Sequence, residues 1–187
     1  MDWARHRRRK AAAKCHMQLN LQTFLPQFAI VKNASTHDST EAYRLCSNLK
    51  SGEIAVFDKA YVDFRHLAEL DNRGIFWVTR AKDNMSYRIV GQHNDPQGNI
   101  VSDVLVELET PKSYEAYPKL IRIVTADVEI NGKEKRISFI TNNMKWASSS
   151  ICDLYGCRWG VEVFFKQIKQ TLQLADFVGH SQNAILW

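Results

Sequence analysis

The stretch Ile54-Ala-Val-Phe-Asp58 decides the fold of this chain, because a run of four apolar residues ends abruptly in an acid. A short apolar run of this kind is typical of a strand that is buried on both faces of a sheet. A helical pattern follows from about Asp63 to Asn72, and Ile75–Thr79 is the next apolar run. Strand, helix and strand in this order predict a right-handed crossover and an α/β fold with parallel strands.

The pattern changes on both sides of this unit. Upstream, Lys14–Leu21 and Gln27–Lys32 predict a β-hairpin, and a helix is expected from Asp38 onward. Downstream, residues 83–145 are rich in strand-like runs, and we interpret them as an antiparallel β insertion. The chain contains no repeat and no Ser/Pro-rich linker, so residues 1–187 are expected to form a single domain.

Two further local signals complete the outline. An Asn131-Gly132 pair between apolar-rich runs predicts a tight hairpin inside the β insertion. From about Trp146 to Leu174 the pattern becomes helical, and it is interrupted only by Gly156 and Gly160. We therefore expect a mixed sheet with flanking helices.

The composition excludes several classes of protein. The chain has 187 residues, 45% of them apolar, and no apolar stretch approaches the ~20 residues that a membrane-spanning helix needs. Its four cysteines form no CxxC pair, and its histidines lack the spacing of a zinc site. No secretory signal is recognisable, so we expect a cytoplasmic protein with no membrane partner.

Positive charge is concentrated at the start of the chain. Residues 1–14 carry six basic groups and one acid, which equals the net charge of +5 of the whole chain. A basic segment of this density suits contact with a phosphate backbone, and a solvated basic face is the simpler alternative. The candidate DNA-binding residues in this segment are Arg7, Arg8, Arg9 and Lys10.

The last helical segment carries a second group of candidates. At 100° per residue, one narrow stripe of this helix holds the side chains of Tyr155, Arg158, Glu162, Lys166 and Lys169. The stripe runs beside an apolar face, so the helix is expected to pack on a core and to hold Glu162 at its rim. A carboxylate among basic residues in this position suits a metal or a phosphate ligand.

Asp58 is the natural partner of Glu162. It follows a buried strand, and ligands of open α/β sheets dock at the carboxyl ends of the strands. Two carboxylates beside a basic stripe suit Mg²⁺ and phosphoryl transfer. Each residue also has a simpler interpretation that stays open: Asp58 caps a turn, Glu162 pairs with Arg158 or Lys166, and Tyr155 packs in a core.

The spacing of the last stripe carries a resemblance. Tyr155, Arg158, Glu162 and Lys169 fit the pattern Y(2)R(3)E(6)K, which resembles the C-terminal signature of DDE-type transposases of bacterial insertion sequences. The segments that resemble other parts of this family are Arg5–His16, Ile54–Tyr61, Phe76–Lys82, Ile140–Asn143 and Phe164–Lys169. The resemblance therefore covers essentially the whole chain.

The resemblance implies an RNase H-like fold with an inserted antiparallel β subdomain, two Mg²⁺ or Mn²⁺ ions, and DNA strand cleavage followed by strand transfer. Asp58 and Glu162 would be the second and third acids of the catalytic triad and ligands of the metals. Arg158, Lys166 and Lys169 would grip phosphates of the transposon end, and Tyr155 would contact the same phosphates or support Glu162. Transposon-end and target DNA would be the partners of an active homodimer in the bacterial cytoplasm, associated with the nucleoid.

One part of the family pattern lies outside this sequence. In the family, the first acid lies on a strand upstream of the segment in which this chain begins. We therefore expect a domain that is incomplete at its N-terminus, lacks its first strand and has weak or no activity alone. One alternative is a non-catalytic DNA-binding remnant that regulates an intact transposase. Another is an RNase H-like nuclease that acts on a different nucleic acid.

Overall fold

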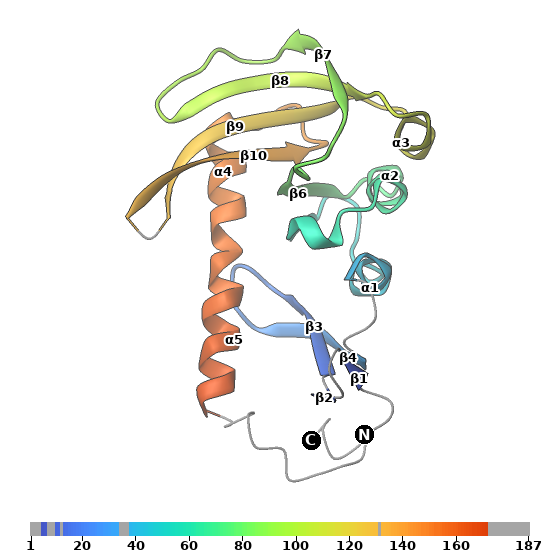
Figure 1. Ribbon diagram of the computed structural model, residues 1–187, viewed down its shortest axis with the longest axis vertical. Coiled ribbons are helices and arrows are strands. Elements are labelled where there is room, and N and C mark those ends of the chain that lie inside the picture. Colours follow the sequence, from blue (N-terminus) through green and yellow to red (C-terminus); the bar gives the residue numbers. More distant parts are fainter. Residues whose placement is uncertain (1–4, 7–9, 12, 34–37, 131, 172–187) are drawn as a thin grey trace. The chain divides into compact units, whose positions relative to one another are not determined.

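The computed structural model describes residues 5–6, 10–11, 13–33, 38–130 and 132–171. The chain forms two compact units, one made of Met1–Ser47 with Cys157–Trp187 and the other of Asn48–Gly156. We call these the terminal unit and the central unit, and Figure 1 traces both. The predicted boundaries of a single domain with an insertion at residues 83–145 stay a prediction.

A six-stranded sheet forms the central unit, and its strands follow one another in space in the order β5-β6-β10-β9-β8-β7 (Figure 1). The strands are β5 (Ile54–Phe57), β6 (Phe76–Arg80), β7 (Tyr87–Gln92), β8 (Ile100–Leu108), β9 (Ile121–Ile130) and β10 (Lys133–Thr141). The helices are the 3-10 turn η2 (Lys59–Tyr61), α2 (Phe64–Asn72), α3 (Pro111–Ala116) and α4 (Ser148–Cys157), whose last residue belongs to the terminal unit.

Strands β5 and β6 are the parallel pair that the sequence predicts. Their register runs from Ile54 opposite Phe76 to Phe57 opposite Thr79, and α2 connects them along the chain. Asp63 caps α2 by accepting hydrogen bonds from two backbone N–H groups of the first turn. Such a cap satisfies donors that have no partner inside the helix. The predicted strand, helix and strand are therefore confirmed. The predicted burial of the first strand on both faces is wrong, because β5 lies at the end of the strand order and only its Ala55 is buried.

The β-rich segment extends the same sheet through antiparallel pairs. Ile130 pairs with Lys133 across the predicted turn, and Gly132 has a φ of 72°, in the left-handed region that glycine tolerates. Strand β10 pairs with β9 on one side and with β6 on the other. The short helix α3, which begins with Pro111, was not predicted from the sequence.

Helices cover both faces of this sheet. Neighbouring residues of a strand point to opposite faces. On β6, Val78 belongs to the apolar cluster that also contains Ile151 of α4, and Trp77 packs edge-on against Tyr117, just after α3, at a centroid distance of 5.9 Å. Helix α4 therefore covers one face, and the other face meets the α3 region.

In its described residues, the terminal unit contains the predicted hairpin and two helices. Its elements are β1 (Arg5–His6), β2 (Lys10–Ala11), β3 (Ala13–Leu19), β4 (Pro26–Asn33), α1 (Asp38–Leu45) and α5 (Trp159–Thr171). Strands β3 and β4 pair in antiparallel register, and α1 packs on them. Of the helical pattern predicted from about Trp146 to Leu174, residues 148–171 form α4 and α5, which are separated at Arg158, and residues 172–174 lie outside the described residues.

The fold confirms the predicted α/β class with a mixed sheet and flanking helices, and it is compatible with an RNase H-like transposase fold. Among the described residues, no helix is long and apolar enough to cross a membrane.

Candidate active site

Asp58 lies directly after β5, at the carboxyl end of the parallel strand pair. Its backbone is still extended, with φ −73° and ψ 158°, and its side chain caps η2. The Oδ1 atom of Asp58 accepts a hydrogen bond of 2.6 Å from the backbone N–H of Lys59. The simpler interpretation of Asp58 as a turn cap is therefore observed, and the same contact fixes the carboxylate at the edge where α/β sheets bind ligands.

Two loops meet at this edge. The Lys59 ammonium donates a hydrogen bond of 2.8 Å to Asp83, and the Lys82 ammonium donates one of 2.7 Å to the carbonyl oxygen of Val62. These contacts tie the loop after β5 to the loop after β6. The hydrogen bond and charge of Lys59 hold the pKa of the exposed Asp83 carboxyl below its ordinary value.

A third cation belongs to the same edge. Phe57 is opposite Thr79 in the parallel register. The residues that come next on the two chains, Asp58 and Arg80, therefore occupy equivalent positions at the carboxyl ends of β5 and β6. Arg80 is half-buried, and its charge also lowers the pKa of Asp83. Sequence reasoning assigned no role to Arg80 or Lys82. Their position at and just after the end of β6, the strand that is parallel to β5, is a signal that could have made both candidate residues.

Glu162 lies in the first turn of α5, where a negative charge interacts favourably with the helix dipole. Its Oε1 atom accepts a hydrogen bond of 2.7 Å from Nη2 of Arg158, and the Glu162 side chain is 63% exposed. The alternative of an ion pair with Arg158 is therefore observed. The Arg158 side chain is only 14% exposed, but the carboxylate end of the pair is open to solvent, so a ligand can reach it and compete for it.

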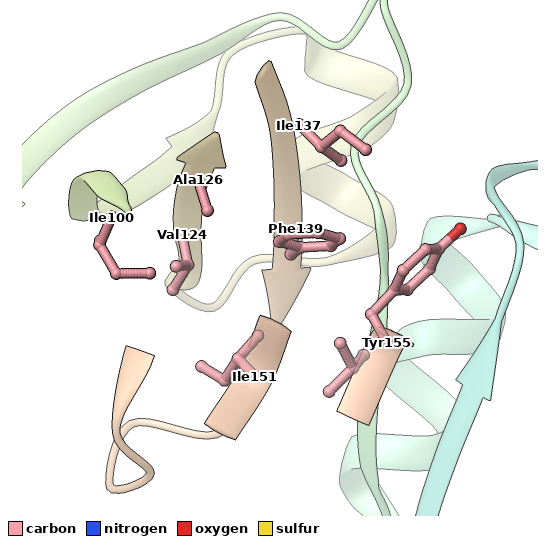
Figure 2. Packing of buried hydrophobic residues seen from close by; sticks show 8 residues of the cluster. Ile100, Val124, Ala126, Ile137, Phe139, Ile151 and Tyr155 are labelled. Carbon is pink, nitrogen blue, oxygen red and sulfur yellow. The ribbon is translucent and has the colours of Figure 1, made fainter. Parts of the chain in front are cut away.

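Tyr155 is placed in the core of the central unit. It is 3% exposed, and its ring lies 5.0 Å from the ring of Phe139 between centroids. Figure 2 shows Tyr155 and Ile151 of α4 beside the strand residues of the same cluster. The simpler interpretation of Tyr155 as a core residue is therefore observed, and its predicted roles, contact with phosphates or support of Glu162, stay predictions.

The remaining basic candidates are described only in part. Lys166 is exposed on α5, one helical turn after Glu162. Lys169 and Lys10 lie in α5 and β2, but their side chains are outside the described residues, as are Arg7, Arg8 and Arg9 as a whole. The DNA contacts predicted for all of these residues stay predictions.

The chemistry of Asp58 and Glu162 suits a hard divalent cation, because both supply carboxylate oxygens. Basic side chains lie near each of them in the sequence, Lys59 beside Asp58 and Lys166 one helical turn after Glu162. No group of three or more His, Cys, Asp and Glu residues that could hold a metal ion occurs in the described part of the chain. Asp58 belongs to the central unit and Glu162 to the terminal unit, so their predicted meeting at shared metals stays a prediction.

Comparisons with known proteins agree with the sequence resemblance. The chain is 27% identical over 188 residues to "Putative transposase y4zB" of Sinorhizobium fredii, an alignment that covers 98% of this chain and 51% of the relative. It is 25% identical over 188 residues to "Probable transposase for insertion sequence element IS5377" of Geobacillus stearothermophilus, with coverage of 99% and 48%. The chain thus spans about half the length of these curated relatives.

A more distant relative carries the same kind of name. The chain is 23% identical over 172 residues to "Putative transposase for insertion sequence element IS4SA" of Synechocystis sp., with coverage of 89% of the chain and 46% of the relative. The family described as "Transposase DDE domain" matches residues 2–186, which is nearly the whole sequence. This chain belongs to the family of transposase DDE domains.

Proposed function

We propose that this chain is part of an enzyme that cuts DNA at the ends of an insertion sequence and joins the freed ends to target DNA. The single observation that carries the proposal is the position of Asp58, an acid held at the carboxyl end of the strand that pairs in parallel with β6, in a chain of this family. Open α/β sheets bind their ligands at such strand ends, so a carboxylate there is placed to contact a ligand. The exposed Glu162 would supply the second carboxylate.

Asp58 and Glu162 would hold two Mg²⁺ or Mn²⁺ ions. Such ions, when bound, activate the attacking oxygen and stabilise the leaving oxygen of a phosphodiester. The backbone N–H of Lys59 orients the Asp58 carboxylate, and the guanidinium of Arg158 orients that of Glu162. Both contacts restrict the carboxylates before the substrate arrives.

Basic side chains would bind and position the DNA. Arg80 and Lys82 lie at the same sheet edge as Asp58, and Lys166 lies one helical turn from Glu162. Lys and Arg neutralise phosphates and release condensed counterions, so binding should weaken as salt increases. Arg7, Arg8, Arg9, Lys10, Arg158 and Lys169 would add to these contacts.

Transposon-end DNA and target DNA are the proposed partners. Two transposon ends have to be processed together, so we propose a homodimer as the active complex. The proposal places the protein with the bacterial chromosome in the cytoplasm.

Substitution of the two acids tests the proposal. A plasmid carrying the DNA that flanks the gene on both sides is incubated with the protein and Mg²⁺ or Mn²⁺. Asp58→Asn and Glu162→Gln should abolish metal-dependent strand cleavage and leave DNA affinity within about twofold, because each removes a ligand charge and keeps the shape of the side chain. Asp95→Asn and Glu134→Gln, at exposed positions outside the site, are the matched controls.

The outcomes separate the alternatives. Cleavage that persists in Asp58→Asn would refute the proposed role of this residue. Salt-sensitive DNA binding without cleavage by the unsubstituted protein would support the DNA-binding remnant. A cleaved product without a transferred strand would support a nuclease.

A further inference from the structure

A fully buried ion pair lies inside the sheet of the central unit. Asp103 of β8 and Arg122 of β9 are both 0% exposed. Nε of Arg122 donates to Oδ1 of Asp103 at 2.8 Å, and Nη2 donates to Oδ2 at 2.6 Å. Two parallel hydrogen bonds between charged groups fix both the distance and the orientation of the pair.

The same two side chains reach beyond the strands that carry them. Nη1 of Arg122 donates to the carbonyl oxygens of Asn143 at 3.2 Å and Trp146 at 2.7 Å, both in the connection from β10 to α4. The Ser148 hydroxyl, in the first residue of α4, donates to Oδ2 of Asp103 at 2.6 Å. The pair therefore holds the point at which α4 begins.

Two additional contacts complete this arrangement. Asn94, in the loop between β7 and β8, donates to Oδ2 of Asp103 at 2.8 Å, so the ion pair also holds this loop. The side-chain oxygen of Asn143 accepts hydrogen bonds from the backbone N–H groups of Lys145 and Trp146 at 2.8 and 2.9 Å. The connection before α4 is thus held both by its own turn and by the guanidinium of Arg122.

Geometry, more than stability, explains such a pair. Well-packed apolar residues often stabilise a core as well as a buried ion pair does, because the two charges lose their hydration. Burial opposes the ionisation of Asp103, yet hydrogen bonds from Arg122, Ser148 and Asn94 keep its pKa below the ordinary value. The pair remains charged, and its directed bonds to Asn143, Trp146 and Ser148 hold the β10–α4 connection.

We propose that Arg122 and Asp103 are positioning residues for the reaction, because they set the start and direction of the helix that leads to Glu162. This inference rests on the proposed function. Helix α4 ends at Cys157, Arg158 follows, and Glu162 lies in the first turn of the next helix. Neither Arg122 nor Asp103 touches substrate in this proposal.

The length of α4 makes its starting point important. Ten residues span about 15 Å at about 1.5 Å per residue, so a tilt of about 5° at Ser148 moves the other end by roughly 1.3 Å. A misplacement of about 1 Å in an active site can reduce a rate by about 100-fold. Under the proposed function, in which Glu162 follows α4 along the chain, a small loss of definition at the buried pair would therefore reduce the cleavage rate.

The test compares two arginines that make the same kind of bond. Arg122→Lys keeps the charge and loses the second directed bond to Asp103. Arg136→Lys does the same to the Arg136–Asp127 pair, whose two bonds measure 2.9 and 2.8 Å. Arg136 is 63% exposed and adjoins Ile137, which faces α4, so Arg136 points to the opposite face of the sheet.

Amide hydrogen exchange and single-turnover kinetics of strand cleavage supply the two readouts on the full chain. Arg122→Lys should accelerate exchange at least about tenfold in residues 143–152, with strands β8 and β9 still protected. The cleavage rate at saturating DNA should fall about 10- to 100-fold with the DNA dissociation constant within twofold. Arg136→Lys should change neither quantity.

Ser148→Ala, which removes a single hydroxyl and leaves the ion pair, should show the same pattern more weakly and remains informative if Arg122→Lys does not fold. Unchanged exchange in residues 143–152, or an unchanged cleavage rate in both variants, would overturn the inference. If the unsubstituted protein cleaves no DNA, which is also the outcome expected of a domain without its first acid, the proposed function gains no support, and the exchange result still decides whether the pair defines the start of α4.

Discussion

Replacing Asp103 with asparagine removes the charge that balances Arg122 in the interior of the central unit. Asparagine keeps the size of the side chain and one acceptor oxygen. It replaces the other oxygen with an amide donor, at a position where Arg122, Ser148 and Asn94 all donate. The substitution therefore leaves the buried Arg122 cation without its counter-charge. It also places an amide N–H donor against side chains that are themselves donors, so these hydrogen bonds are lost.

The expected loss of stability is large. Removing one partner of a buried pair costs about 3–5 kcal/mol, because the remaining charge is neither hydrated nor neutralised. The total free energy of unfolding of a typical domain is about 5–15 kcal/mol. With a urea m value of about 2 kcal/mol/M, the unfolding midpoint should fall by roughly 1.5–2.5 M.

Urea unfolding followed by far-ultraviolet circular dichroism measures this effect. Asp127→Asn is the matched control, because Asp127 accepts the same two bonds from Arg136, whose side chain is 63% exposed. The urea midpoint of Asp127→Asn should equal that of the unsubstituted protein within error, since water replaces the lost contact. The double substitution Asp103→Leu with Arg122→Met should recover much of the loss, because no buried charge remains.

Equal shifts for Asp103→Asn and Asp127→Asn would refute the reasoning, because the two pairs share their geometry and differ in burial. A double variant less stable than Asp103→Asn would show that the polar groups which lose their partners, the Ser148 hydroxyl and the carbonyls of Asn143 and Trp146, cost more than the unbalanced charge.

Two further predictions concern titratable groups. Burial is the main cause that lowers the pKa of His66, against Asp63 and Glu69, so the unfolded chain takes up a proton near its ordinary pKa of about 6.5 while the folded chain resists it. The free energy of unfolding should therefore decrease as the pH is lowered below about 6.5. The urea midpoint of His66→Gln should decrease less over this range than that of the unsubstituted protein, and parallel plots of midpoint against pH would contradict the prediction. Burial and the charges of Asp153 and Asp103 raise the pKa of Cys152 to about 11, so only about one thiol in a thousand is ionised at about pH 8. Iodoacetamide should label the exposed Cys157 well before Cys152 under these conditions, as measured by mass spectrometry of the peptides. Faster labelling of Cys152 would contradict this prediction.

Much of the sheet could be predicted because its signals are local. Ile54–Phe57 is apolar at every position and stops at an acid, and the strand has these same bounds. Asp63 and Gly74 mark the two ends of α2, one as a cap and the other with a φ of 72°. Helix α3 has only six residues, too few for a helical period, although Pro111 at its start is a helix-start signal.

The part of the site that depends on long-range contacts could not be predicted. The sequence indicates that Asp58 ends a strand, but the bond between Lys59 and Asp83 joins residues 24 positions apart. Asp103 and Arg122 resemble ordinary charged residues within strands, where exposure is the usual expectation. Only the register between β8 and β9 brings them together inside the sheet.

The simple interpretations of Asp58 and Glu162 and their proposed catalytic roles use the same contacts. A carboxylate offers about four lone-pair positions, so a hydrogen bond from Lys59 N–H or from Arg158 orients the group and leaves capacity for a metal ion. A cap holds its oxygen in place more firmly than an exposed ion pair does. The Asp58 carboxylate should therefore be the fixed ligand of the pair, and Glu162 should adjust to the bound substrate through its weaker bond to Arg158.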